Sequence, residues 1–112
     1  METFDLARLV TECDQADRRW REFLRSDSLS MGVYRLKAGQ TDEQRPHTED
    51  EVYLVLSGRA SFRVGADERA VGTGTVIFVE RNVEHRFVNI AEDLTVLVFF
   101  APAESASGAN ET

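Results

Sequence analysis

The sequence predicts an all-β protein built around one antiparallel barrel, with a single short helix near its N-terminus. Two observations predict this class. Apolar and polar residues alternate with a period of two in several short segments after residue 20. Turn-forming residues, above all glycine, separate most of these segments. Many short strands with frequent turns are typical of sandwiches and barrels rather than of parallel βαβ sheets.

The elements follow in order along the chain. Apolar residues between Phe4 and Val10 recur at helical spacing, and we expect this short helix to end within the polar stretch 12–19. Seven strands are then expected, each with an alternating pattern that buries one face. They span residues 20–24, 29–36, 51–56, 60–64, 75–79, 85–90 and 94–100.

Short polar or glycine-containing segments predict the reversals between these strands. The reversals are expected at 38–40, 57–58, 65–68, 72–74 and 91–93. Residues 103–112 are rich in Ala, Ser, Glu and Asn without apolar periodicity, which predicts a flexible tail. The expected organisation is a single domain, with a helix and an edge strand in 1–26 and the barrel in 27–102.

Composition narrows the partners and the compartment. The 112 residues suffice for one domain, and the net charge of −7 disfavours nucleic acid or an anionic membrane as a partner. Cys13 is the single cysteine, so an internal disulfide is excluded. The N-terminus lacks a basic region followed by an apolar run, and we expect a cytoplasmic protein.

Both histidines of the chain lie in positions that invite a test for metal binding. His47 is followed four residues later by Glu51, and a straight strand would separate their Cα atoms by roughly 13 Å. The polar residues 48–50 could form the bend that brings the two side chains together. His85 shares strand parity with Phe87 and so is expected to be buried.

Two segments carry motifs that match a known family. Residues 39–58 resemble the first cupin motif, G-x5-H-x-H-x3-E-x6-G, with Arg45 in place of its first histidine. Residues 74–89 resemble the second motif, G-x5-P-x-G-x2-H-x3-N, with Glu80 in place of proline and Asn82 in place of glycine. On these motifs the chain resembles small single-domain proteins of the cupin superfamily.

The resemblance implies a fold, a cofactor and an assembly. The fold would be the double-stranded β-helix, a jelly-roll barrel, and the ligands of one divalent metal would be His47, Glu51 and His85. Two imidazoles and a carboxylate suit zinc or iron best, with manganese and nickel as alternatives. A homodimer formed through N-terminal strands is also implied. Its candidate contacts are Trp20, Phe23 and Leu24.

Arg45 leaves two alternatives open, because a guanidinium does not ligate a metal. It could face solvent, while Gln44, Glu49 or a water completes the ligand set. It could instead clamp a carboxylate or phosphate above the metal. The residues expected to line a ligand pocket are Arg45, Tyr53, Phe87 and Asn89, of which Tyr53 could orient a ligand of the metal.

These features favour a metal-dependent enzyme, dioxygenase-like or isomerase-like, that acts on a small oxygen-bearing molecule. A non-catalytic protein that binds or senses a metal or small ligand is the competing class. A metal-free barrel that binds an anion through Arg45 is the third. The sequence identifies no catalytic acid or base.

Overall fold

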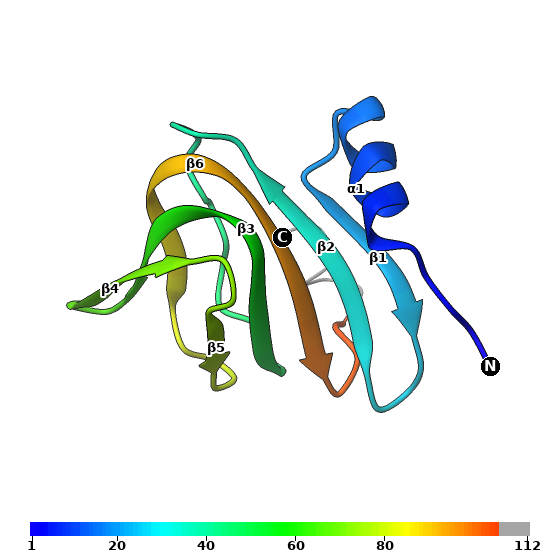
Figure 1. Cartoon of the computed structure of the whole chain (residues 1–112). Coiled ribbons are helices and arrows are strands. Elements are labelled where there is room, and N and C mark those ends of the chain that lie inside the picture. Colours follow the sequence, from blue (N-terminus) through cyan, green and yellow to red (C-terminus); the bar gives the residue numbers. More distant parts are fainter. Residues whose placement is uncertain (106–112) are drawn as a thin grey trace.

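The computed structural model describes residues 1–105. One six-stranded antiparallel sheet curls around a buried interior, and a single helix packs outside it (Figure 1). This architecture confirms the predicted all-β class with a short N-terminal helix. The elements are α1 (Leu6–Gln15), β1 (Trp20–Arg25), β2 (Ser30–Leu36), β3 (Asp50–Val64), β4 (Asp67–Gly72), β5 (Val76–Val79) and β6 (His85–Ala101).

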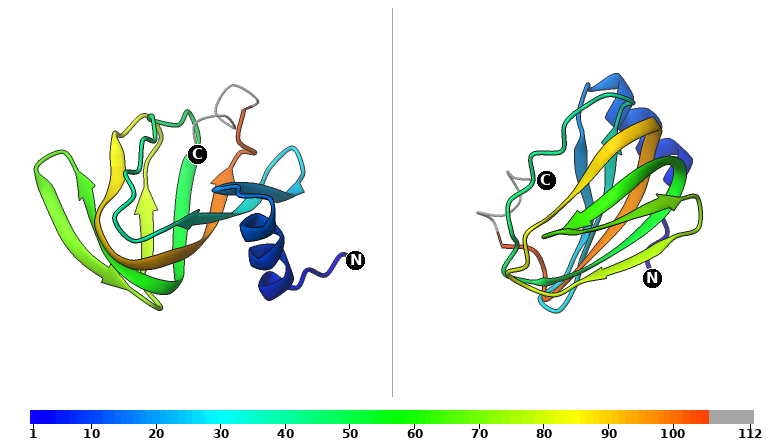
Figure 2. Two further views of the ribbon diagram at one scale, coloured as in Figure 1. Left: turned by 90° about the horizontal axis from the view of Figure 1, so that it is seen from above. Right: turned by 90° about the vertical axis from the view of Figure 1, so that its left-hand side faces the viewer.

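Strands β3 and β6 form the centre of the sheet. The strand order is β1-β2-β6-β3-β4, and β5 also pairs with β3. Because the first part of β3 pairs with β5 and its second part with β4, the two long strands serve both halves of the barrel. Seen from above, their curvature bends the sheet into a U around the interior (Figure 2).

The reversals predicted at 57–58 and 91–93 are wrong, because β3 and β6 are continuous there. Their pairing shifts register several times between Val55 and Ser61, so the strands bend at bulges while staying paired. Gly58 adopts a φ of +99° and Asn89 a φ of +50° at these bends. Four expected strands therefore merge into two.

Strand β4 was not predicted from the sequence. Its residues are exposed apart from Val71 and the half-buried Gly72, so it lacks the alternation that marks a half-buried strand. It pairs with β3 across the reversal that was expected at 65–68, where Gly65 has a φ of +57°. Local turn chemistry, rather than burial, forms this hairpin.

Helix α1 begins two residues later than the apolar pattern indicated. The Asp5 carboxylate accepts hydrogen bonds from the backbone N–H groups of Ala7 and Arg8, which caps the helix. Leu9 and Cys13, four residues apart, are its buried positions. Within residues 1–105, no helix is long and apolar enough to span a membrane.

Trp20, one of the candidate dimer contacts, packs against the interior of its own chain. Its ring lies edge-on to Tyr34 and Phe100, with centroids 6.5 and 6.1 Å away. It also covers Gly32, where an added Cβ would overlap the indole ring. The Trp20 side chain therefore has a structural role within one chain, and its contact with a second copy stays a prediction.

Residues 102–105, which follow β6, pack against the barrel, although a flexible tail was expected from residue 103. Glu104 is completely buried, and its backbone N–H donates a hydrogen bond of 2.8 Å to Ser30 Oγ. The Arg25 guanidinium donates to the carbonyl oxygen of Glu104. The start of the predicted tail is thus part of the packed structure, and residues 106–112 lie outside the described residues.

The interior of the barrel is apolar over most of its length and polar toward one side. Aromatic rings of Tyr53, Phe62 and Phe87 contact one another with centroids 4.9 to 5.5 Å apart. Asp42, Glu51 and other charged or polar side chains are also buried. Buried charges need partners, so this polar side is where a functional site is expected.

Candidate metal centre

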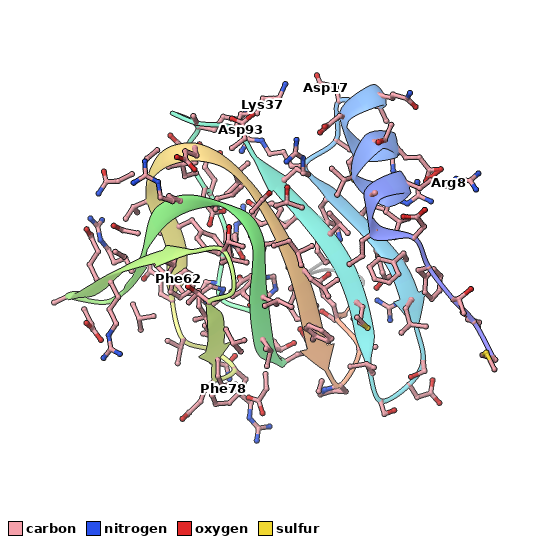
Figure 3. All side chains as sticks on the ribbon, in the orientation of Figure 1. Arg8, Asp17, Lys37, Phe62, Phe78 and Asp93 are labelled. Atoms are coloured by element: carbon pink, nitrogen blue, oxygen red, sulfur yellow. The ribbon has the colours of Figure 1, made fainter. Side chains whose placement is uncertain are left out.

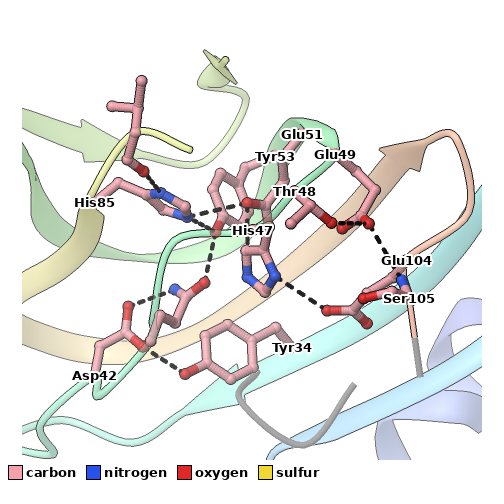
Figure 4. A network of polar contacts seen from close by, with 12 residues as sticks. Tyr34, Asp42, His47, Thr48, Glu49, Glu51, Tyr53, His85, Glu104 and Ser105 are labelled. Carbon is pink, nitrogen blue, oxygen red and sulfur yellow. Dashed lines mark hydrogen bonds and ion pairs between the residues drawn. The ribbon is translucent and has the colours of Figure 1, made fainter. Parts of the chain in front are cut away.

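His47, Glu51 and His85 converge inside the barrel (Figure 4). His85 Nε2 lies 3.0 Å from Glu51 Oε1, and His47 Nε2 lies 3.9 Å from the same oxygen. The three side chains are at most 2% exposed. Within residues 1–105, each of these three side chains offers one atom that could bind a metal, a histidine nitrogen or a carboxylate oxygen. The three atoms lie within 4.8 Å of one another.

Each of the three residues comes from a different place in the fold. His47 lies in the loop before β3, where its carbonyl oxygen accepts a 2.7 Å hydrogen bond from Asn82 N. Glu51 is the second residue of β3, which begins at Asp50, and His85 is the first residue of β6. The bend expected between His47 and Glu51 is therefore present.

The hydrogen bonds of the two imidazoles define which nitrogen faces the centre. His85 Nδ1 lies 2.8 Å from the carbonyl oxygen of Val83, which can only accept, so this nitrogen carries the hydrogen. His47 Nδ1 lies 3.2 Å from a carboxylate oxygen of Glu104. In the neutral rings, both Nε2 atoms then present lone pairs toward Glu51.

These lone pairs and the Glu51 carboxylate form a cluster that attracts positive charge. Neither oxygen of Glu51 accepts a hydrogen bond from the described residues. Burial lowers the pKa of His47, but the hydrogen bond with Glu104 and the charge of Glu51 outweigh burial, so the pKa is raised. A buried cation stabilises a cluster in which lone pairs converge and no hydrogen-bond donor faces them. The three residues could therefore hold a metal ion.

A second network of hydrogen bonds surrounds Asp42, which the motifs did not single out. The buried Asp42 carboxylate accepts hydrogen bonds from Tyr34 Oη at 2.6 Å, Gln44 Nε2 at 2.6 Å and Phe87 N at 2.8 Å. Because the carboxylate only accepts, the Gln44 amide must turn its nitrogen toward Asp42. Its oxygen is then left facing the barrel interior.

Tyr53 connects this network to the centre. Its hydroxyl donates to Gln44 Oε1 at 2.8 Å, and its oxygen lies 2.9 Å from His85 Nε2. Burial and the neighbouring charge of Glu51 raise the pKa of Tyr53 well above its usual value, so the phenol stays protonated. With its hydrogen directed to Gln44, the Tyr53 oxygen faces the centre as an acceptor.

The other residues expected to line a pocket divide into two groups. Phe87 is buried, as expected, against Tyr53 and Phe62. Asn89 is exposed, and the expectation that it faces the interior is wrong. Its left-handed backbone at a bulge breaks the alternation that began at His85, so the next buried residue is Ile90.

Arg45 is exposed and lies in the loop before β3. Gln44 and Glu49, considered as additional ligands, are engaged elsewhere. The Gln44 amide is shared between Asp42 and Tyr53. Glu49 Oε2 accepts hydrogen bonds from Thr48 Oγ1 at 2.5 Å and from the backbone of Ser105 at 3.3 Å.

Glu104 is the neighbour of the centre that sequence reasoning missed. It follows the last strand in a segment without periodicity, so no local pattern marks it. Its approach to His47 depends on the chain returning to the barrel after β6.

A surface hollow of about 160 Å³ reaches His85. It is lined by Arg63, Gly65, Glu84, His85 and Arg86.

The family follows from a comparison with known proteins. Residues 32–100 match the model of the cupin domain, which covers more than half of the chain. The chain belongs to the cupin family. Membership confirms the double-stranded β-helix that the two motifs predicted. His47, Glu51 and His85 all lie within the matched residues.

One relative in sequence and two solved structures are similar to this chain. An uncharacterized protein of Streptomyces coelicolor is 47% identical over 105 residues, which is 94% of this chain and 100% of that protein. The solved structure of TT1209 from Thermus thermophilus is 27% identical with a TM-score of 0.73, covering 92% of this chain and 99% of that chain. The DMSP lyase DddQ from Ruegeria pomeroyi is 24% identical with a TM-score of 0.66. That match covers 78% of this chain, which spans only about half (49%) of the lyase.

Proposed function

We propose that this cupin binds one divalent metal ion through His47, Glu51 and His85 and is a metal-dependent enzyme. The observation that carries the proposal is the convergence of two imidazole lone pairs on a buried carboxylate that accepts no hydrogen bond from the described residues. A cation between these atoms would be bound at once by both Nε2 lone pairs and by the Glu51 carboxylate. The reaction would be of the dioxygenase or isomerase type on a small oxygen-bearing molecule.

The donor set supports a metal with open coordination positions. Two nitrogen atoms and one carboxylate suit zinc or iron, and manganese or nickel less well. The chemistry that such an ion supplies is polarisation of a carbonyl or enolate oxygen or, for iron, reaction with dioxygen. The three ligand residues would bind the metal and would not act as the acid or base that transfers a proton.

Tyr53 is proposed to orient the substrate at this centre. Its hydroxyl hydrogen is directed to Gln44, so its oxygen can accept a hydrogen bond from a substrate hydroxyl. Phe87 would form an apolar wall beside it. The hollow that reaches His85 supports an approach from the side of β3 and β6 where Arg63 and Arg86 lie. Exposed Arg45 would act at the rim, on an anionic ligand.

A second candidate is a non-catalytic module that binds or senses a metal or small ligand. The observation that favours it is the burial of the centre, since the candidate ligands are at most 2% exposed. A substrate would have to displace part of this packing. The solved DMSP lyase shows that the same fold serves an enzyme, and this supports the catalytic candidate by fold alone.

Metal analysis of protein purified without chelators tests the proposal. We expect close to one equivalent of a transition metal per chain by mass spectrometry of the elements. Iron with substrate-dependent oxygen uptake would support a dioxygenase, whereas zinc without oxygen uptake would direct the search to isomerase or lyase substrates. Bound metal without turnover in either class of assay would favour the sensing module. Negligible metal would exclude the metal-dependent enzyme and a metal sensor, and would leave a barrel that binds a small ligand without metal.

We also propose that the protein is a homodimer and that its outer sheet face contributes to the contact. Phe78 and Val76 on β5 are 60% and 65% exposed, and Phe78 lies at the outer edge of the barrel (Figure 3). Val52 and Phe99 neighbour Phe78 around a hollow of about 410 Å³. Exposed apolar surface of this kind is typical of contact surfaces.

Replacing Phe78 by Ser is expected to convert the dimer to a monomer at micromolar concentration. The side chain is exposed in the single chain, so the substitution removes contact area without opening a cavity. Light scattering coupled to size exclusion measures the mass. Arg59→Ser, a substitution at an exposed side chain on β3 away from Phe78, is the control and should remain dimeric. A wild-type mass near 12.6 kDa would contradict the dimer.

A further inference from the structure

A buried carboxylate beside the centre comes from outside both motifs. Glu104 follows β6, is fully buried, and places Oε2 3.2 Å from His47 Nδ1. Figure 4 shows it on the opposite side of the His47 ring from His85. We propose that Glu104 is a positioning residue that holds His47 in the tautomer whose Nε2 lone pair faces Glu51 and His85. Its effect on metal affinity rests on the proposed function.

The physical reason is the fixed polarity of the contact. A neutral imidazole carries one hydrogen, and a carboxylate can only accept it. With the carboxylate at Nδ1, the hydrogen is held there and Nε2 is left as the acceptor. A carboxylate paired in this way fixes both the tautomer and the ring orientation, and makes the other nitrogen a better ligand.

Within residues 1–105, three backbone contacts hold Glu104 and its neighbour in place. Its backbone N–H donates to Ser30 Oγ on β2, and the Arg25 guanidinium on β1 donates to its carbonyl oxygen. The following residue, Ser105, donates its N–H to Glu49 Oε2 in the loop before β3. The segment after β6 is thus tied to two strands and to the loop that carries His47. These contacts hold the Glu104 carboxylate next to the His47 imidazole.

His85 offers an internal control, because a different group holds its ring. Its Nδ1 lies 2.8 Å from the backbone carbonyl oxygen of Val83, which no side-chain substitution removes. Changing Glu104 should therefore affect the tautomer of His47 and leave that of His85 unchanged. The chain contains only these two histidines, so their ring nitrogens can be assigned without crowding.

Nitrogen-15 NMR of the metal-free protein tests the tautomer directly. The spectra are recorded above the raised pKa of His47, so that its ring is neutral. We expect the wild type and Glu104→Gln to show hydrogen on Nδ1 of both rings, since the glutamine oxygen can still accept. In Glu104→Ala, His47 should gain the Nε2–H form while His85 keeps its own. Hydrogen on His47 Nε2 in the wild type would overturn the inference, even if the alanine variant does not fold.

Metal affinity provides the second readout, measured by competition with a chromophoric chelator and zinc. We expect Glu104→Ala to bind zinc about 10- to 100-fold more weakly than the wild type, and Glu104→Gln to recover most of that loss. Equal affinity in the alanine variant and the wild type would contradict a positioning role. If the wild type binds no metal, the proposed function fails, and the NMR result alone supports or overturns the role of Glu104.

Discussion

Replacing His85 by Ala is expected to weaken metal binding by more than about 100-fold. The substitution removes one of three proposed ligands, and partners outside the ligand sphere are already worth about 10- to 100-fold in other metal sites. The Nε2 atom of His85 lies 3.0 Å from Glu51 Oε1, so the substitution removes a ligand atom that lies directly beside the carboxylate. Calorimetric titration of the metal-free protein with zinc measures the change.

The matched control for His85→Ala is Asn89→Ala. Asn89 is in the same strand and in the same motif, but it is exposed and outside the centre. We expect it to keep the metal affinity of the wild type, although its left-handed backbone can reduce stability. Circular dichroism checks that both variants are folded. Wild-type affinity in His85→Ala would remove this residue from the ligand set.

Replacing Gly58 by Ala is expected to destabilise the fold by about 3 kcal/mol or more. Gly58 lies at the bend of β3 with a φ of +99°, which strains any residue that has a Cβ. The added Cβ would overlap the backbone carbonyl oxygen of Asp93 on β6. A backbone atom in a paired strand cannot move aside cheaply. Urea unfolding measures the free energy.

Gly65→Ala separates the two causes. Gly65 also has a positive φ, of +57°, but an added Cβ there would meet no atom within 4 Å. It should lose only about 1 kcal/mol, the strain of the left-handed backbone. An equal loss in both variants would show that the close approach of β3 and β6 at Gly58 contributes nothing to the preference for glycine.

The candidate ligands could be predicted because the motifs encode local geometry. His47 and Glu51 need only a bend between them, and the polar residues before β3 provide it. His85 needs only to begin a strand with its side chain turned inward. These are short-range requirements, and a sequence pattern of a few residues captures them.

Predictions that depended on extending a pattern across a bulge did not succeed. Asn89 shares strand parity with His85, yet its left-handed conformation just before Ile90 reverses the alternation. Gly58 has the character of a turn residue, yet it permits a bend inside a paired strand. Glycine and asparagine promote both structures, and only the long-range pairing of β3 with β6 distinguishes them.

Glu104 and Asp42 could not be found in this way, because their roles depend on distant partners. Glu104 approaches His47 from the far end of the chain, and Asp42 accepts a hydrogen bond from Phe87 N across 45 positions of sequence. Neither carboxylate has a local signature. Burial of an acidic side chain in a tail or loop becomes visible only once the barrel is assembled.

A crystal structure of the metal-loaded protein, with anomalous diffraction recorded at the absorption edge of the bound metal, tests whether His47, Glu51 and His85 are the ligands. We expect one peak per chain, bonded to Nε2 of His47, Nε2 of His85 and a carboxylate oxygen of Glu51 at about 2.0 to 2.2 Å for zinc. A metal bonded elsewhere, or to either imidazole through Nδ1, would contradict it.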